Sequence, residues 1–141
     1  MDADLRIVYE EHPEQSAWGV IGRGVGEHNR RQAGDPGGKR LCYVLADREG
    51  EVVGGVVAEL QWDWLYVDLL WVREDLRGRG FGGRLLESVE DDARRRGARR
   101  AYLDTFSFQA PEFYKRYGYG VFGELPDFPP GHRRYYLTKQ L

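Results

Sequence analysis

The sequence is poor in the residues that mark disulfide-bonded, metal-binding and membrane proteins. It has a single cysteine, Cys42, so no disulfide can form within the chain, and its three histidines lack the spacing of metal ligands. No apolar run approaches the roughly 20 residues of a membrane-spanning helix. The first residues, MDADLRIVYEEHPEQ, lack the basic start and apolar centre of a signal peptide. These absences predict a cytoplasmic protein without a metal or a membrane partner.

Charge is nearly balanced, with 21 Lys and Arg against 23 Asp and Glu, for a formal net charge of -2. A nucleic-acid-binding domain normally carries a basic excess. The arginine-rich stretch at 94–100 does not change this expectation, because three of its arginines follow an acidic residue by four positions, as on a solvated helix face. The length of 141 residues suits one domain spanning 1–141, with no nucleic-acid partner.

Hydrophobic periodicity predicts an α/β fold built on a mixed (α+β) sheet. The segment 64–72, the amphipathic helix 81–96 and the segment 99–108 form a βαβ unit, whose two strands should be parallel. The rest of the sheet should be mostly antiparallel, with helices on both faces. The other expected strands are 41–47, 51–60, 119–125 and 133–141, and the other expected helices are 14–31 and 110–118.

The stretch LRGRGFGG at 76–83 has four glycines and two arginines between a strand and a helix. One or two glycines would suffice to turn the chain, whereas four remove side chains from a whole loop at a cost in backbone entropy. A helix N-terminus presents unpaired N–H groups and a partial positive charge. The loop therefore favours an anionic ligand, a phosphate or pyrophosphate.

Two nucleotide-binding motifs compete for this loop. The triphosphate motif GxxxxGK[ST] is absent from the chain. The dinucleotide motif GxGxxG is matched by Gly78, Gly80 and Gly83, with Asp104 about twenty residues on. However, REDL separates the strand from the loop, and too little chain follows Asp104 for the second half of such a domain. A dinucleotide-binding protein is therefore the weaker alternative.

The loop resembles the signature of the GCN5-related N-acetyltransferase (GNAT) superfamily, Arg/Gln-x-x-Gly-x-Gly/Ala, which Arg77 to Gly82 match at every specified position. The segment APEFYKRYGY resembles the family's second motif, a short helix that ends in tyrosine and is followed by a Gly-aromatic pair. Ser107 stands where many members carry asparagine. The stretch LDTFSFQAPEFYKRYGY with the PPGHRR turn is similar to a small bacterial branch of mostly undefined substrate.

This resemblance implies the acyl-CoA N-acyltransferase fold and acetyl-coenzyme A (acetyl-CoA) as cosubstrate. It implies direct transfer of acetyl to a primary amine of a small molecule or peptide, without a covalent enzyme intermediate. Homodimers are common in the family. In the family, the strand before the loop separates from its neighbour and pairs with the pantetheine arm. The cofactor-binding residues so implied are Leu70, Trp71, Val72, Arg77, Gly78, Arg79, Gly80, Phe81, Gly82 and Tyr114.

Two residues are catalytic candidates. Tyr114 falls on the motif's tyrosine and could donate a proton to the leaving thiolate. Asp68 interrupts an apolar strand, and burial there would make its carboxylate a stronger base. In a regular pleat, it would share a face with Trp64, Tyr66 and Leu70. Asp104, Glu59 and an ordered water are rival bases.

The aromatic residues Trp62, Trp64 and Tyr66 could line an acceptor pocket, although such residues more often belong to a core. The family resemblance also implies that backbone N–H groups near Trp71 or Val72 could stabilise the tetrahedral oxyanion.

A protein that keeps the loop but lacks the chemistry, a non-catalytic acyl-CoA sensor or interaction module, is the alternative to an enzyme. The identity of the acceptor is left open.

Overall fold

The computed structural model describes residues 4–141, and its contacts divide the chain into two units, Met1–Pro36 and Gly37–Leu141. The first unit holds the short turn η1 (Pro13–Gln15) and helix α1 (Ala17–Ala33), which ends at Gly34 with φ 81°. The helix predicted over 14–31 is thus present, beginning slightly later and ending slightly later. No residue of α1 is buried, and Trp18, Ile21 and Val25 are all more than half exposed.

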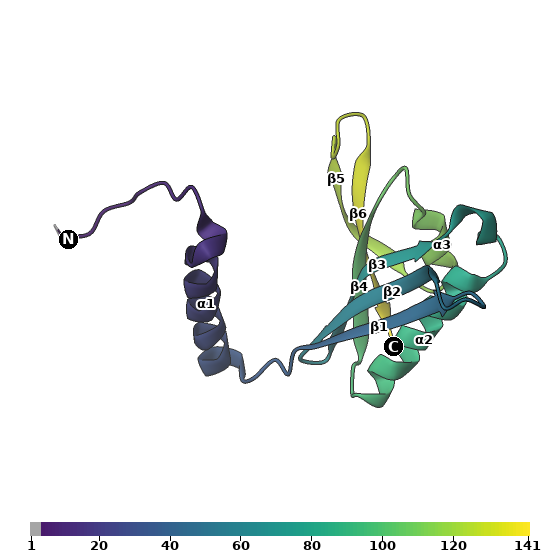
Figure 1. The fold of residues 1–141 in the computed structure, drawn as a ribbon, viewed down its shortest axis with the longest axis horizontal. Coiled ribbons are helices and arrows are strands. Elements are labelled where there is room, and N and C mark those ends of the chain that lie inside the picture. Colours follow the sequence, from purple (N-terminus) through teal and green to yellow (C-terminus); the bar gives the residue numbers. More distant parts are fainter. Residues whose placement is uncertain (1–3) are drawn as a thin grey trace. The chain divides into compact units, whose positions relative to one another are not determined.

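The second unit is built on a six-stranded sheet (Figure 1), with the order β1-β2-β3-β4-β6-β5. Only β3 and β4 pair in parallel, and the other neighbours are antiparallel, which confirms the mixed sheet and its central βαβ unit. The strands are β1 (Lys39–Ala46), β2 (Val52–Gln61), β3 (Trp64–Val72), β4 (Arg100–Phe106), β5 (Gly120–Pro126) and β6 (Arg133–Gln140).

One face of this sheet carries the core. Helix α2 (Phe81–Arg95) contacts β1, β2 and β3 and lies along them in Figure 1. Its apolar stripe, which includes Leu86 and Val89, is buried against the inward-facing strand residues Leu65 and Leu103. The predicted buried face of α2 is therefore confirmed. Burial of this apolar surface is the main contribution to stability, at about 25 cal/mol per Å² of apolar area removed from water.

Helix α3 (Pro111–Arg116) lies on the same side as α2, because the Phe113 ring lies 3.4 Å from the point where a Cβ on Gly82 would stand. The short turn η2 (Glu74–Leu76) joins β3 to the glycine loop. Within the unit Gly37–Leu141, both helices thus cover one face of the sheet. The sequence predicts helices on both faces of the sheet, and α2 and α3 of this unit account for one of those faces.

Two irregularities in β3 matter for the site. Val57 pairs with Leu69 whereas Ala58 pairs with Val67, so Asp68 is an extra residue in a β-bulge. The parallel pairing between β3 and β4 ends at Tyr66↔Tyr102, although both strands continue. Beyond that pair, the two strands separate inside the sheet. Among residues 4–141, no helix is both long and apolar enough to cross a membrane.

Candidate active site

A cleft of about 670 Å³ opens where β3 and β4 separate. One wall is the end of β3 from Asp68 to Val72 with Arg77, and the other is the end of β4 from Asp104 to Phe106. Tyr114, Tyr66 and Arg134 complete it, together with Phe108, Gln109 and Ala110. The cleft therefore brings together the predicted residues Asp68, Leu70, Trp71, Val72, Arg77 and Tyr114, and the rival base Asp104.

The backbone of β3 can be oriented from its hydrogen bonds. The Arg73 amide donates to the Val53 carbonyl at 2.8 Å, toward β2. Because backbone groups alternate along a strand, those of Leu70 and Val72 face the opposite side, where β4 has separated. Arg77 Nε donates to the Val72 carbonyl at 2.8 Å on that side. The amides that face the cleft are thus those of Leu70 and Val72, and that of Trp71 faces β2.

The glycine loop leads directly from this cleft into α2. Within residues 4–141, the six consecutive backbone amides from Gly78 to Gly83 have no recorded hydrogen-bond acceptor, and Arg84 is the first to donate, to Gly80. No side chain caps the helix. Unpaired amides at a helix N-terminus form an anion-binding concavity. The predicted residues Gly78, Arg79 and Gly80 of the loop, and Phe81 and Gly82 of the first turn of α2, thus lie beside the cleft and are not among the residues that line it.

The four glycines of the loop fall into two structural groups. Gly78 and Gly80 have φ of 76° and 86°, in the left-handed region that residues with a Cβ rarely adopt. Gly82 and Gly83 are helical and lie against α3: a Cβ on Gly82 would touch the Phe113 ring, and one on Gly83 would overlap the Tyr117 ring. The interpretation that all four glycines open the loop to a ligand is therefore wrong for Gly83, which is buried and allows the two helices to pack.

Tyr114 projects from α3 into the cleft and packs edge-on against Phe113, with ring centroids 5.1 Å apart. Desolvation by burial raises the pKa of Tyr114 to about 12, and the charge of Asp104 adds to the shift. The phenol therefore keeps its proton throughout the neutral range. Its hydroxyl has no recorded hydrogen-bond partner among residues 4–141, which leaves it able to donate to a ligand.

Asp68 is exposed, so the burial expected from its apolar neighbours is wrong. The bulge is the cause, because it leaves the side chain at the mouth of the cleft. The bulge also changes the faces of the strand: Leu70 packs against the core, so it does not share a face with Tyr66 as a regular pleat predicts. In the described part of the chain, the Asp68 carboxylate has no recorded ion pair or hydrogen bond, and both oxygens can accept a proton.

Asp104 is held by a different environment. Its Oδ1 accepts hydrogen bonds from Arg134 Nη2 at 2.7 Å and Nε at 3.0 Å, and its Oδ2 accepts one from the Tyr66 hydroxyl at 3.1 Å. These hydrogen bonds raise the pKa of Arg134, and burial together with the Asp104 charge raises the pKa of Tyr66 to about 12. The Arg134 guanidinium also lies 5.0 Å from the centre of the Phe128 ring. Asp104 is thus an anchored carboxylate with few free acceptor sites.

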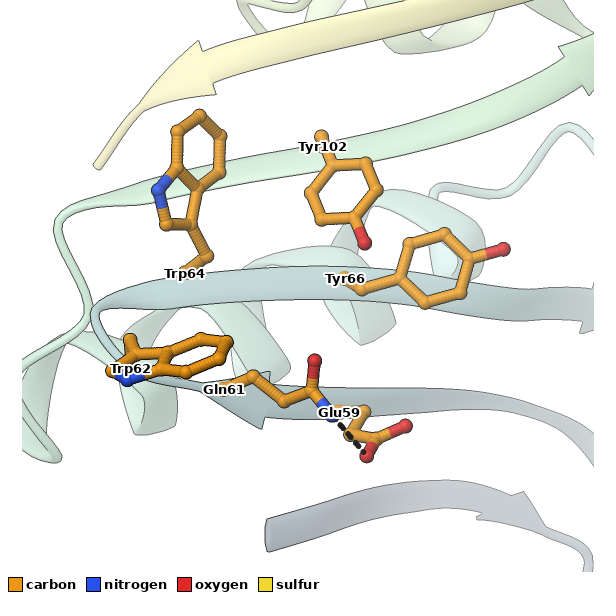
Figure 2. A pocket seen from close by; sticks show the side chains of 6 residues that line it. All are labelled: Glu59, Gln61, Trp62, Trp64, Tyr66 and Tyr102. Carbon is orange, nitrogen blue, oxygen red and sulfur yellow. Dashed lines mark hydrogen bonds between the residues drawn. The ribbon is translucent and has the colours of Figure 1, made fainter. Parts of the chain in front are cut away.

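A second hollow, the aromatic pocket, lies on the open face of the sheet and is shown in Figure 2. The three aromatic residues that the sequence offers for an acceptor site, Trp62, Trp64 and Tyr66, all line it, and the side chain of Glu59 closes one side. The Tyr66 ring stacks on Tyr102, with centroids 4.8 Å apart. Because Tyr66 lines both hollows, the aromatic pocket and the cleft adjoin each other.

Sequence reasoning missed two contributions to the cleft. Arg134 was not singled out, because it lies thirty positions from its partner Asp104. Gln109 was also missed: its Oε1 accepts hydrogen bonds from the Phe106 amide and the Thr105 hydroxyl, which closes the end of β4. Ser107, the departure from the family's asparagine, has a structural contact, since its hydroxyl accepts the Arg133 amide at 3.0 Å.

Comparison with known proteins agrees with this geometry. The sequence model of the acetyltransferase (GNAT) family matches residues 6–119. Blasticidin-S acetyltransferase of Streptomyces morookaense is 45% identical over 100 residues, which are 70% of this chain and 73% of that protein. The crystal structure of an acetyltransferase from Bacillus cereus is 34% identical, with a TM-score of 0.87 over 97% of this chain and 98% of that chain.

A more distant structure, a streptothricin acetyltransferase from Bacillus anthracis in complex with acetyl coenzyme A, shares the fold at 18% identity. Its TM-score is 0.64, and the match covers 72% of this chain and 62% of that chain. The family match spans most of the sequence and includes both the glycine loop and Tyr114. The chain therefore belongs to the acetyltransferase (GNAT) family, and it is an acetyl-CoA-dependent acetyltransferase.

Proposed function

We propose that this protein transfers acetyl from acetyl-CoA directly to a primary amine within the cleft between β3 and β4. The observation that carries the proposal is the cleft's continuity with the glycine loop, because Arg77 lines the cleft and is followed directly by the six unpaired backbone amides. One long donor molecule can occupy both the loop and the cleft, with its anionic head at the loop and its amide-containing arm in the cleft. Family membership supports acetyl-CoA as that donor.

The loop holds the pyrophosphate. The amides from Gly78 to Gly83 point to the anion, and the partial positive charge of the α2 N-terminus adds to the attraction. Arg79 is exposed beside the loop, with its Nη2 3.4 Å from the Asp75 carbonyl, and it can turn toward a phosphate. The pantetheine amides pair with the free backbone edge at Leu70 and Val72, as an added strand would.

The chemical step needs no covalent enzyme intermediate. The neutral amine nitrogen attacks the thioester carbonyl carbon, forming the C–N bond. The tetrahedral oxyanion accepts a hydrogen bond from the Leu70 amide, which faces the cleft farther from the glycine loop. The C–S bond then breaks, and the electron pair leaves with sulfur. Tyr114 donates a hydrogen bond to the departing thiolate. A phenol with a pKa of about 12 is a poor proton source for a thiol of pKa about 8.5, so solvent completes the protonation.

The proton that leaves the amine goes to Asp68, directly or through one water. Asp68 lines the cleft with both carboxylate oxygens open to solvent, whereas Asp104 is occupied by Arg134 and Tyr66. Glu59 lies in the aromatic pocket and outside the cleft. Asp104 serves instead to hold Tyr66, and its charge is paired with Arg134.

Two glycine variants test the donor site with matched backbone strain. Gly80 and Gly97 stand at opposite ends of α2, with φ of 86° and 93°, and a Cβ on either meets nothing within 4 Å. Both Gly→Ala variants should therefore lose about 1–2 kcal/mol of stability. Only Gly80→Ala should also lose the rise in melting temperature that acetyl-CoA produces. Equal acetyl-CoA shifts in the two variants would contradict the assignment.

The catalytic assignment is tested separately by Tyr114→Phe. The variant removes the hydroxyl but keeps the ring that packs against Phe113. Turnover, followed as released thiol, should fall by about 10²-fold or more, the usual range for removing a hydrogen-bond donor to a developing anion, while the acetyl-CoA shift in melting temperature persists. A variant that keeps full turnover would remove Tyr114 from the mechanism.

A further inference from the structure

The turn between β2 and β3 holds a tryptophan in an unfavourable backbone conformation. Gln61 pairs with Trp64, so the turn has two residues, Trp62 and Asp63. Trp62 has φ 52°, in the left-handed region where such turns usually place asparagine, aspartate or glycine. Its side chain does not enter the core, since the residue is 46% exposed. Core packing therefore does not account for a strained tryptophan at this position, whereas its indole lines a hollow on the surface.

That surface is the aromatic pocket, a hollow of about 270 Å³. In Figure 2, the rings of Trp62, Trp64, Tyr66 and Tyr102 surround it, and the Glu59 carboxylate lies at one side. Glu59 Oε1 accepts a hydrogen bond from Gln61 Nε2 at 3.3 Å, and its Oε2 lies 4.0 Å from Arg40 Nη2, at the limit of an ion pair. The carboxylate is only weakly neutralised, and its side chain is 37% exposed.

Aromatic faces beside a carboxylate select planar cations. The chain itself gives an example, because the guanidinium carbon of Arg100 lies 4.8 Å from the centre of the Trp64 ring. Arg100 is not among the residues that line the pocket, so its guanidinium does not occupy that space. Gln61 adds an amide that can hydrogen-bond the same group.

The pocket also has a fixed relation to the reaction centre. Tyr66 lines the pocket with its ring and reaches the cleft with its hydroxyl, which donates to Asp104. A ligand can therefore place one group in the pocket and extend past Tyr66 into the cleft beside Asp68. The carboxylates of Glu59 and Asp68 place negative charge at the two ends of this path.

We propose that the aromatic pocket is the acceptor's specificity site and that the acceptor is a primary amine tethered to a guanidinium group. The guanidinium stacks between the rings and pairs with Glu59, and the amine lies in the cleft. This inference rests on the proposed acetyl transfer and deepens it by naming the class of acceptor. The strained β2–β3 turn places the Trp62 indole among the rings that line this pocket.

The test uses agmatine, a primary amine with a guanidinium group, and n-butylamine, which has the same four-carbon chain without it. Binding to the protein saturated with coenzyme A is measured by calorimetry. Agmatine should bind at least tenfold more tightly than n-butylamine. Glu59→Gln should reduce that ratio to less than threefold, whereas Glu51→Gln, in the exposed β1–β2 turn, should leave it unchanged.

Trp62→Asn separates a binding role from a folding role. Asparagine suits the left-handed position, so the melting temperature should stay the same or rise, while agmatine binding weakens at least fivefold. Equal binding of the two amines, or an agmatine preference that survives both Glu59→Gln and Trp62→Asn, would overturn the inference. The acetyl-CoA thermal shift is measured in parallel: if it persists while agmatine shows no preference, the acceptor assignment alone fails. If the thermal shift is absent, the proposed transfer itself fails.

Discussion

Gly83→Ala should destabilise the protein although it places alanine in a helix. A Cβ at Gly83 would overlap the Tyr117 ring, which packs against Phe113 with centroids 5.0 Å apart. Overpacking costs up to about 3 kcal/mol, and the better helix propensity of alanine returns at most about 1 kcal/mol. The expected net loss is about 2 kcal/mol. For a chain of this size, that loss lowers the melting temperature by about 8 °C.

The assay is thermal unfolding followed by circular dichroism, with Gly82→Ala as the matched control. A Cβ on Gly82 makes only an ordinary contact of 3.4 Å with Phe113, so this variant should keep or slightly raise the melting temperature. Tyr117→Leu should remove the clash, and adding Gly83→Ala to it should then cost almost nothing. If Gly83→Ala has the same melting temperature as the wild type, or if it lowers the melting temperature by as much in the Tyr117→Leu background, the packing argument is wrong.

Two further predictions concern buried polar groups. The pKa values of Tyr66 and Tyr114 are raised from 10.0 to about 12, so the stability they contribute is complete below about pH 10 and is lost as pH rises toward 12. Melting temperatures should fall over that interval, and Tyr114→Phe should flatten the fall; an equally steep fall in the variant would contradict it. Glu90 is buried and accepts hydrogen bonds from Lys139 at 2.9 Å and Tyr119 at 2.7 Å. In chemical denaturation, Lys139→Met should lower the free energy of unfolding by about 3–5 kcal/mol, because it leaves the buried Glu90 carboxylate unpaired. Adding Glu90→Leu should recover much of that loss, and a double variant that recovers none would contradict this explanation.

The sheet could be predicted largely from local patterns. Alternating apolar residues and short turns place all six strands to within a few residues, and the apolar stripe of α2 fixes which side of that helix is buried. The glycine loop could be placed between β3 and α2 because it lies between them in the sequence, and local rules suffice for it. Tyr114 lies on α3, and only the family resemblance assigned it to the same site.

The bulge at Asp68 shows where local rules fail. The buried residues Leu65 and Val67 occupy odd positions, and after the bulge the inward-facing residues Leu70 and Val72 occupy even ones. This change of phase is a signal in the sequence, but Leu69 is apolar and hides it. The exposure of Asp68 follows from the bulge and could not be predicted from a regular pleat.

The Asp104–Arg134 pair shows a different limit. It forms because β6 enters the sheet between β4 and β5, with Asp104 opposite Tyr136. Neither the order of the strands nor their register is encoded near Asp104 in the sequence. The anchoring of that carboxylate, which distinguishes it from Asp68, therefore requires the tertiary structure.

The early separation of β3 from β4 also bears on how the enzyme is restrained by its own product. The groups offered by the open strand edge and the glycine loop would grip the pantetheine amides and the pyrophosphate, and neither is altered when acetyl departs. Spent coenzyme A would therefore keep nearly every contact proposed for the loaded donor. A site of this design responds to the ratio of acetylated to free coenzyme rather than to the acetylated form alone, and turnover should slow as that ratio falls.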